Sequence, residues 1–384
     1  MRIFIIGVGA TGSYLAKLLV RQGHRVSCGD RDPERASYFL GEKLPIPIGR
    51  VNARDVWSII KATRGAQLIV NTCPPVLNRI VLRAALRLRA HYLDTASHYT
   101  DHPFRAEQRR FTGRFELKER TAIITAGVAP GLTNLLIAAG ADLLDSVESV
   151  RVRLYESTEA DGPFSQWSAE ASFDEAIARP PLYVDGHFCF GRRFGGRELF
   201  QFPAPIGQVK VVLAAQDEVI TAPSVIPMKA MDAKFGGSDI DRLRRWYRQG
   251  KLRKSRSPSA LRFMRTPTPR TVQRLLRRGV LHNARFAASA IVSGMKHKRA
   301  MTVRWDVTVP SLFQLRRAHV LCSPIAWASA HMAALFIKHF PRNLHGVHPP
   351  EGLPRDLRRT ILHDVRTHGF RITKRVTSRV QQEL

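Results

Sequence analysis

The chain has 384 residues, 44% of them hydrophobic, and no repeat or low-complexity tract, which excludes a disordered or fibrous protein and predicts two domains with substantial cores. Its formal net charge is +30, and residues 242–305 contain nineteen Lys or Arg and no Asp or Glu. A block of this kind can attract nucleic acid or another polyanion, but no nucleic-acid motif and few aromatic residues accompany it.

Cysteine and histidine spacing gives no sign of a metal site. The four cysteines stand at positions 28, 73, 189 and 322, without CxxC or zinc-ligand spacing, and no histidine falls in an HExxH pattern. This usage is typical of buried thiols in a reducing cytoplasm. The uncharged stretch 320–337 approaches membrane-spanning length, but its Ser323, Pro324, Ser329 and His331 favour a buried helix, so we expect no membrane association.

The first thirty-one residues carry the clearest motif. The apolar run 3–6 predicts a strand, Gly7-Val8-Gly9-Ala10-Thr11-Gly12 a turn, the segment with Leu15, Leu18 and Leu19 a helix, and residues 25–30 a second strand. A glycine-rich GxGxxG turn between strand and helix is the fingerprint of a dinucleotide-binding fold.

Each glycine in this turn has its own expected role. Gly7 allows the tight turn, Gly9 lets the backbone approach a pyrophosphate, and Gly12 lets the helix pack closely on the strand. Ala10 and Thr11 begin the helix, whose unpaired N–H groups and dipole favour an anion. We therefore expect the cofactor phosphates to bind along Gly7–Gly12.

Asp30 follows Gly12 by eighteen residues, near the position where a carboxylate accepts hydrogen bonds from the adenosine ribose. A carboxylate there favours NAD because it repels a 2′-phosphate. The adjacent Arg31 could instead bind that phosphate and admit NADP. The sequence leaves both cofactors open.

The rest of the first domain alternates strands and helices, which predicts a doubly wound parallel sheet that closes near Gly127. Strands are expected at 46–51, 66–71, 91–96 and 121–126, with Asn52 capping the helix after the first of them. Asn71, Thr72 and Cys73 follow a buried strand at the carboxyl edge, where nicotinamide cofactors bind, so we expect them to contact the cofactor. No neighbouring base activates the Cys73 thiol as a nucleophile.

Asp94 stands near the carboxyl end of the following strand, four residues before His98. Both can face the cleft and serve as acid/base groups, whereas the alternative is a loop-capping aspartate and an exposed histidine.

After Gly127 the pattern changes to short strands joined by turns, which predicts an α+β second domain with an antiparallel sheet over residues 128–340. Strands are expected at 147–156, 182–184, 187–190, 198–202 and 208–213, with Asp185-Gly186 as a hairpin turn. Asp217 and Glu218 follow the last of these strands and could polarise a substrate amine, or form an ordinary charged turn.

The basic block 242–305 is expected to be mostly helical, followed by an apolar helix at 320–340. Residues 341–384 predict a last helix at 354–367 and a strand at 370–376, and we expect this segment to pack back on the first domain.

Four stretches together resemble the saccharopine dehydrogenase family, which includes lysine 6-dehydrogenases and carboxynorspermidine dehydrogenases. They are GVGATG, then NTCPPVLNRIVLRAALRLRAHYLD from Asn71, AGVAPGLTNLL from Ala126, and GVHPPEGLPRDLRR near the end. The pair Trp167-Ser168 and the region 183–202 also look like the family's middle domain. The basic block departs from that pattern, which leaves the substrate open.

The resemblance implies an NAD- or NADP-dependent oxidoreductase acting on a C–N bond of an amino acid or opine-like secondary amine, by hydride transfer to or from an imine carbon. It also implies a small-molecule amine substrate and a cytoplasmic homodimer. The alternative from another class is a non-catalytic NAD(P)-sensing protein whose basic block binds nucleic acid or a protein partner.

Overall fold

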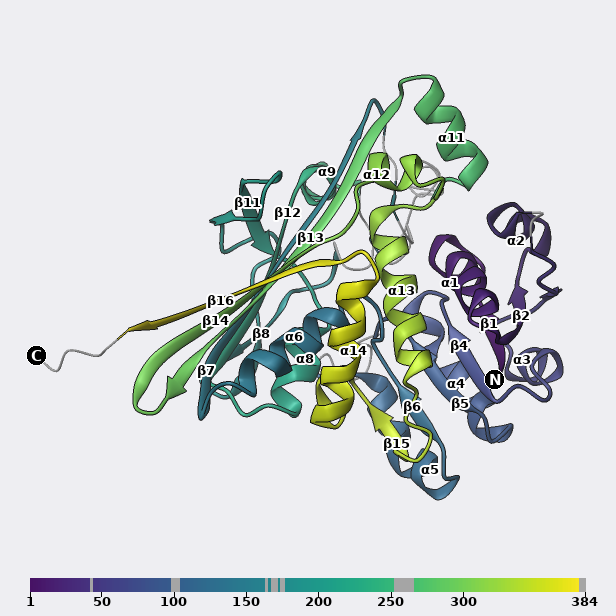
Figure 1. Cartoon of the computed structure of the whole chain (residues 1–384), viewed down its shortest axis with the longest axis horizontal. Coiled ribbons are helices and arrows are strands. Elements are labelled where there is room, and N and C mark those ends of the chain that lie inside the picture. The colour runs from purple at the N-terminus through teal and green to yellow at the C-terminus, as the bar shows by residue number, and fades with distance from the viewer. Residues whose placement is uncertain are drawn as a thin grey trace, which may run out of the picture.

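The computed structural model describes residues 1–41, 44–97, 104–162, 165–166, 172, 177–251 and 266–379. These residues form two sheets, one of seven strands and one of nine. Figure 1 shows the first sheet on the right, the second on the left, and helices between them. The predicted α/β class, a Rossmann domain with a second α+β domain, is confirmed.

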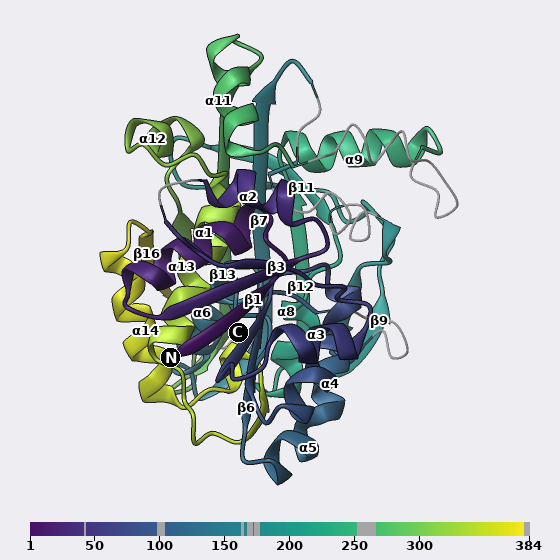
Figure 2. The same ribbon diagram turned by 90° about the vertical axis from the view of Figure 1, so that its right-hand side faces the viewer.

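The first sheet is entirely parallel, in the order β15-β6-β5-β4-β1-β2-β3. Its strands are β1 (Arg2–Ile6), β2 (Arg25–Asp30), β3 (Ile48–Arg50), β4 (Leu68–Asn71), β5 (His91–Asp94), β6 (Thr121–Ile123) and β15 (Gly346–His348). The chain order reverses beside β1, and in open α/β sheets ligands bind at the carboxyl ends of the strands on either side of such a reversal. Figure 2 shows these strands from their outer side.

Helices cover both faces of this sheet because its strands are apolar on both sides. Ile3 and Ile5 are buried in the core shared with the second domain, whereas Phe4 and Ile6 are buried in a separate outer core. The helices are α1 (Ala10–Arg21), α2 (Pro33–Leu40), α3 (Val56–Ala62), α4 (Asn78–Arg87) and α5 (Thr112–Leu117), with 3-10 turns at Pro75–Leu77 and Glu107–Phe111.

One predicted helix cap was wrong. Asp55, not Asn52, caps α3, because the Asp55 carboxylate accepts hydrogen bonds from the backbone N–H groups of Trp57 and Ser58. The Asn52 side chain instead accepts from the N–H of Arg54, two residues on, in the turn before the helix.

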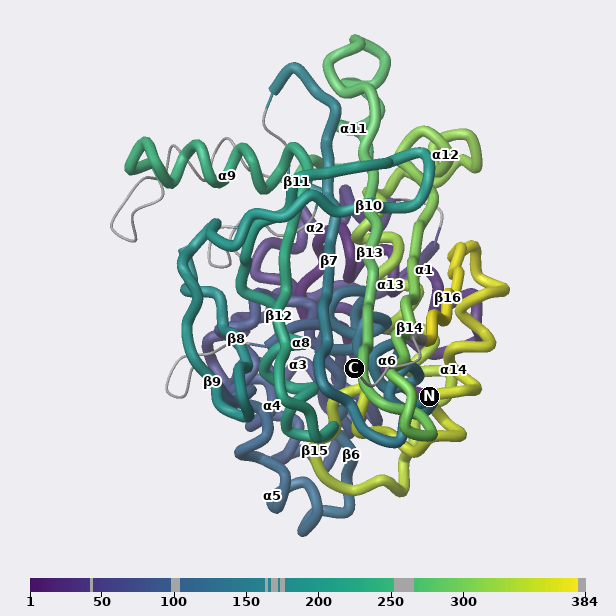
Figure 3. The backbone as a smooth tube through the Cα atoms, turned by 90° about the vertical axis from the view of Figure 1, so that its left-hand side faces the viewer, coloured from purple at the N-terminus to yellow at the C-terminus, as the bar shows by residue number. Residues whose placement is uncertain are grey.

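The second sheet is mainly antiparallel, and Figure 3 shows its long strands from the side opposite the first domain. The exception is the parallel pair β12 and β7. The strands of the second sheet are β7 (Ser146–Ala160), β8 (Pro181–Val184), β9 (His187–Phe190), β10 (Glu198–Gln201), β11 (Gln208–Leu213), β12 (Ala230–Gly236), β13 (Leu281–Lys296), β14 (Arg299–Thr308) and β16 (Arg371–Arg379). The hairpin predicted at Asp185-Gly186 joins β8 and β9, with positive φ at both turn residues.

The prediction that the basic block is mostly helical was wrong for its second half. Residues 281–296 and 299–308 are the strands β13 and β14, which pair with each other. Strand β13 also pairs with β7 along almost its whole length. From Phe286 to Val292 it is buried on both faces, so the alternation that marks a strand is missing from the sequence.

The described helices of the second domain are α6 (Leu132–Ala141), α8 (Glu218–Thr221), α9 (Ser238–Arg248), α11 (Pro269–Arg277), α12 (Leu312–Arg317), α13 (Pro324–Lys338) and α14 (Arg355–Thr367), with 3-10 turns at Ala222–Ser224 and Pro350–Gly352. Among them, α6, α8, α13 and α14 lie between the two sheets, whereas α9, α11 and α12 lie at the upper end of the molecule in Figure 1. Helix α13 packs against both α1 and β13 and so joins the domains. Among the described residues, every helix is too short or too polar to cross a bilayer.

The C-terminal segment contributes to both sheets. Strand β15 extends the first sheet by pairing with β6, whereas β16 is the edge strand beside β14 in the second. Residues far apart in sequence therefore meet where the two sheets face each other.

Candidate functional site: the carboxyl edge of the first sheet

The glycine turn between β1 and α1 is packed so closely that two of its glycines are required by the fold. A Cβ on Gly12 would lie 2.1 Å from the Gly7 carbonyl oxygen and 2.5 Å from Thr72 Oγ1. Gly7 has a φ of +93°, and a Cβ there would lie 2.9 Å from the backbone nitrogen of Cys73. Because L side chains fit neither position, these two glycines are explained without any ligand.

Gly9 is different. A Cβ on Gly9 would have no heavy atom within 4 Å, and its φ of −87° is accessible to every residue type. The chain itself therefore gives no reason for glycine here. Gly9 is the N-cap of α1 and provides no side-chain cap, and no acidic residue occupies the first turn. The open space above Gly9 and the helix N-terminus, where Ala10 and Thr11 begin α1, fit a cofactor pyrophosphate.

Asp30 ends β2 with both carboxylate oxygens bonded to backbone. Oδ2 accepts from the Val8 N–H at 2.7 Å, within the glycine turn, and Oδ1 accepts from the Asp32 N–H at 3.0 Å. The carboxylate thus fixes the turn relative to β2. Each oxygen keeps further acceptor capacity for a ribose hydroxyl.

A second arginine, which the sequence analysis did not identify, lies beside Arg31. Arg50 pairs with Asp30 in the register of β2 and β3. Its Nη1 donates a hydrogen bond to the Arg31 carbonyl oxygen at 2.9 Å. The sequence could have indicated Arg50 only through its place near the end of the strand expected at 46–51. Arg31 directly follows β2 and Arg50 ends β3, and both residues are exposed. Guanidinium groups suit a phosphate.

Asn71 ends β4, and Thr72 and Cys73 follow it. The side chains of Asn71 and Thr72 hydrogen-bond within the protein at the carboxyl edge. Asn71 is 1% exposed, its Nδ2 donates to Asn78 Oδ1 at 2.8 Å, and its Oδ1 accepts from the Cys73 N–H at 3.1 Å. Thr72 Oγ1 donates to the Gly7 carbonyl oxygen at 2.6 Å. The hydrogen bond from Thr72 therefore connects the loop after β4 to the glycine turn. Cys73, in the same loop, is partly exposed.

Asp94 ends β5, is 1% exposed, and is surrounded by donors. Its carboxylate accepts from the Thr125 N–H at 2.8 Å, the Tyr92 hydroxyl at 2.9 Å and Gln108 Nε2 at 3.1 Å. Burial raises the pKa of Asp94 to about 7, while these hydrogen bonds act in the opposite direction.

Asp217 and Glu218 reach the same region from the second domain. Asp217 Oδ2 accepts from the Ser97 N–H at 2.8 Å, and Glu218 Oε1 accepts from Thr133 Oγ1 at 2.5 Å. Burial raises the pKa of both carboxyls, and for Asp217 the charges of Glu218, Asp94 and Glu351 raise it further. The structure thus brings three of the predicted acid/base residues together, whereas His98 lies outside the described residues, as does the Trp167-Ser168 pair.

Glu351, in the 3-10 turn after β15, is a fourth buried carboxyl that the sequence analysis did not single out. It is 1% exposed, and burial raises its pKa to about 7. Thr221 and Asn134 lie beside it and act in the opposite direction. The resemblance stretch GVHPPEGLPRDLRR contains Glu351, which was the only signal in the sequence.

The carboxyl groups of Asp217 and Asp94 are both linked by hydrogen bonds to Ser97, Asp217 directly and Asp94 through Gln108. Asp217 accepts the Ser97 N–H directly, and Gln108 Nε2 links Asp94 Oδ2 to Ser97 Oγ at 3.1 Å each. The backbone just before His98 is therefore held from both domains.

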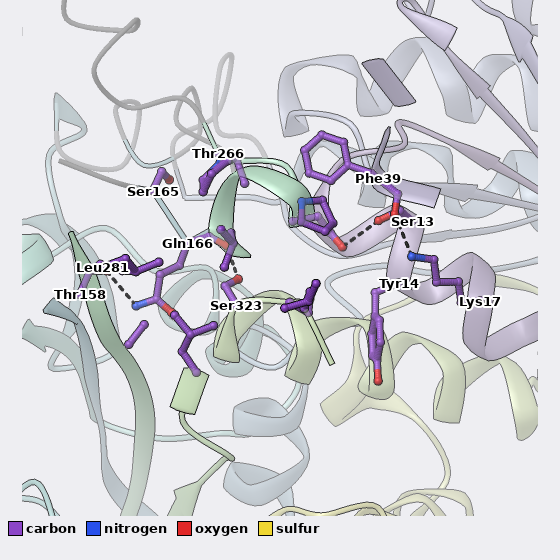
Figure 4. Close-up of a pocket in the computed structure, with 18 residues that line it drawn as sticks. Ser13, Tyr14, Lys17, Phe39, Thr158, Ser165, Gln166, Thr266, Leu281 and Ser323 are labelled. Carbon is purple, nitrogen blue, oxygen red and sulfur yellow. Dashed lines mark hydrogen bonds between the residues drawn. The ribbon is translucent and has the colours of Figure 1, made fainter. Parts of the chain in front are cut away.

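A pocket beside α1 opens between the domains (Figure 4). Ser13, Tyr14 and Lys17 line it from the first domain, and Gln166 and Ser323 from the second. Burial lowers the pKa of Lys17, whose Nζ donates to the Phe39 carbonyl oxygen at 2.8 Å. Among the described residues, no group of His, Cys, Asp and Glu is arranged to hold a metal ion.

Comparison with known proteins agrees with this geometry. Residues 3–123 match the family model of the saccharopine dehydrogenase NADP binding domain. A carboxynorspermidine synthase from Vibrio cholerae is 26% identical over 207 residues, which are 50% of this chain and 48% of that protein. The chain thus aligns with about half the length of its curated relatives. The family match confirms NAD or NADP as the expected cofactor class.

Two solved structures show that the whole fold recurs elsewhere. Saccharopine dehydrogenase (L-Glu forming) from Saccharomyces cerevisiae has a TM-score of 0.71 at 10% identity, covering 98% of this chain and 99% of that one. The homospermidine synthase of Legionella pneumophila, in complex with NAD, has a TM-score of 0.71 at 12% identity, covering 98% and 91%.

Proposed function

We propose that the chain is an NADP-preferring oxidoreductase acting on the C–N bond of an opine-like secondary amine, because its residues 3–123 match the saccharopine dehydrogenase NADP binding domain. The open space above Gly9 is the observation that carries this proposal, because a bound pyrophosphate would account for a residue without a side chain at the N-terminus of α1. The relatives named as carboxynorspermidine and homospermidine synthases support an amine as substrate.

The residues that hold the cofactor follow from the edge geometry. The first turn of α1 binds the pyrophosphate, Asp30 accepts a ribose hydroxyl, and Arg31 and Arg50 bind the 2′-phosphate. Asn71, Thr72 and Cys73 form the wall next to the nicotinamide end. The bound cofactor supplies or accepts the hydride of the reaction.

We base the acid/base assignment on which of the predicted side chains already hydrogen-bond to other groups of the protein. Asp94 and Asp217 both hold Ser97, so we assign them as positioning residues. Glu218 accepts a hydrogen bond from Thr133, so we assign it a positioning role as well. His98 comes directly after Ser97 and is the remaining predicted group for moving the proton to or from the amine nitrogen.

Replacement of His98 tests this division of roles. His98→Gln is expected to lower kcat about 100-fold or more, in the range of general acid–base catalysis, while NADPH binding is kept. Asp217→Asn, which retains an oxygen acceptor for Ser97 N–H, is expected to have a smaller effect on kcat. If His98→Gln turns over normally and Asp94→Asn does not, the proton role belongs to Asp94.

A homodimer in the cytoplasm is the setting we propose for this activity, following the family resemblance. Light scattering of the purified protein tests the assembly directly, and a monomeric mass at assay concentration contradicts it.

A further inference from the structure

A second cavity lies between α6 and α14, with a volume of about 270 Å³. We call it the α6–α14 groove. The two helices lie side by side over the second sheet, and strands β14 and β16 form its floor (Figure 1). None of its lining residues belongs to the cofactor edge described above.

The floor of the groove is apolar and mainly aliphatic. Leu136 and Leu143 line it from α6 and the following turn, Leu362 from α14, and Ile372 from β16. Trp305 of β14, 7% exposed, completes the floor. Leu143, Leu362 and Ile372 remain partly exposed, so an apolar ligand would remove further apolar surface from water.

The rim is cationic. Helix α14 contributes Arg355, Arg359 and Arg366, and β16 contributes Lys374. Arg366 and Lys374 have no carboxylate partner within the described part of the chain, and Arg359 reaches only the exposed Asp356, at 4.0 Å. Lys374 Nζ lies 5.5 Å from the centre of the Trp305 ring.

The one carboxylate that lines the groove is already neutralised by arginines. Asp142 accepts two hydrogen bonds from Arg358 Nη2, at 2.9 Å each, and lies 3.3 Å from Arg355 Nε. The uncompensated charge at the rim is therefore positive, which favours an anion over a cationic amine. An aliphatic floor beneath a cationic rim is complementary to a ligand with an alkyl chain and one anionic end.

We propose that the α6–α14 groove binds a medium-chain carboxylate, with the alkyl chain on the apolar floor and the carboxylate against Arg359, Arg366 and Lys374. The volume of about 270 Å³ accommodates roughly ten carbon atoms, by proportion with a cavity of about 150 Å³ that binds benzene. The site is separate from the dinucleotide edge, so it does not depend on the proposed oxidoreductase activity.

Isothermal titration calorimetry of the full chain with decanoate, below its self-association concentration, tests the proposal. Saturable binding of one decanoate per chain is expected, with decyltrimethylammonium, which has the same chain and the opposite charge, failing to bind. No saturable binding of decanoate, or equal binding of both compounds, overturns the proposal. So does binding only to vesicles that contain an anionic lipid, because that result identifies a membrane-facing surface instead.

Variants locate the binding in the groove. Arg359→Gln with Arg366→Gln is expected to weaken decanoate binding about tenfold or more, the loss of one or two charge-assisted hydrogen bonds. Leu362→Gln tests the floor and is expected to weaken it similarly. The matched control, Arg316→Gln with Arg317→Gln on α12, removes two exposed arginines elsewhere and should leave binding unchanged. Unaltered affinity in both groove variants, with Tm close to that of the parent protein, overturns the assignment.

Discussion

The backbone N–H of Ser97, in the loop after β5, donates a 2.8 Å hydrogen bond to the carboxylate of Asp217 at the start of α8. This bond joins the first domain to the second at the carboxyl edge of the parallel sheet. Asp217 is 7% exposed, and burial with the nearby carboxyls raises its pKa. Asp217, which makes this contact between the domains, therefore also holds the backbone of Ser97, the residue before His98.

Asp217→Ala removes the acceptor of this interdomain bond. We expect a loss of about 1–3 kcal/mol in the free energy of unfolding, because the Ser97 N–H is left buried without a partner. Asp217→Asn is the matched control and should keep most of the stability. Urea unfolding of the three proteins measures the difference, and equal midpoints for Asp217→Ala and the parent protein would show that the bond contributes little.

Gly9→Ala separates a cofactor requirement from a folding requirement. Since a Cβ on Gly9 meets nothing within 4 Å, the variant should fold with unchanged Tm but bind NADPH about tenfold or more weakly. Gly113→Ala, on the exposed face of α5, serves as a control that should bind normally. Titration of NADPH fluorescence measures the affinity, and normal binding by Gly9→Ala contradicts the proposed pyrophosphate position.

Arg50→Gln tests the choice of cofactor. Because Arg50 lies beside Arg31 at the ribose end of the site, its loss should raise the Kd for NADPH about tenfold and leave the Kd for NADH nearly unchanged. Arg54→Gln, in the turn after β3, is a nearby charge control. Equal weakening of both cofactors by Arg50→Gln would mean that this arginine only supports the fold.

The four buried carboxyls predict how stability depends on pH. Burial raises the pKa of Asp94 and Glu351 to about 7, and raises the pKa of Asp217 and Glu218 as well. A carboxyl whose pKa is higher in the folded state stabilises the fold below its unfolded pKa, and this contribution is lost as the pH rises through the folded pKa.

Tm should therefore fall as the pH rises from about 4, near the unfolded pKa of these carboxyls, through about 7, the folded pKa of Asp94 and Glu351. Glu351→Gln, which cannot ionise, should show a shallower fall than the parent protein. Thermal unfolding at several pH values decides this, and parallel curves for the two proteins would exclude Glu351 as a contributor.

The strand-turn-helix-strand unit of the proposed cofactor site could be predicted from sequence because its signals are local. Gly7, Gly9 and Gly12 lie in one short turn between β1 and α1, and Asp30 follows within the same strand-helix-strand unit. Arg50 was missed because its closeness to Arg31 depends on the parallel pairing of β2 and β3, which no local pattern reveals.

The second domain depends on contacts between distant residues, and there the sequence analysis failed more often. In strand β13 every residue from Phe286 to Val292 is buried, and all but Ser289 are apolar, because β7 and β14 flank the strand and both of its faces are covered. Such a run is equally compatible with a buried helix. The hydrogen bonds that link Ser97 to Asp217 and Thr133 to Glu218 likewise join segments 120 and 85 residues apart.

The central claim, reduction of a C–N double bond with NADPH, is tested most directly by following NADPH absorbance with mixtures of an amine and an aldehyde or 2-oxo acid. We predict saturable oxidation of NADPH that requires both compounds, and that is strongly reduced in His98→Gln and, at subsaturating NADPH, in Gly9→Ala. Tight NADPH binding without turnover for any pair of lysine or diamines with aldehydes or 2-oxo acids would contradict the claim, and would leave a protein that binds the cofactor without using it.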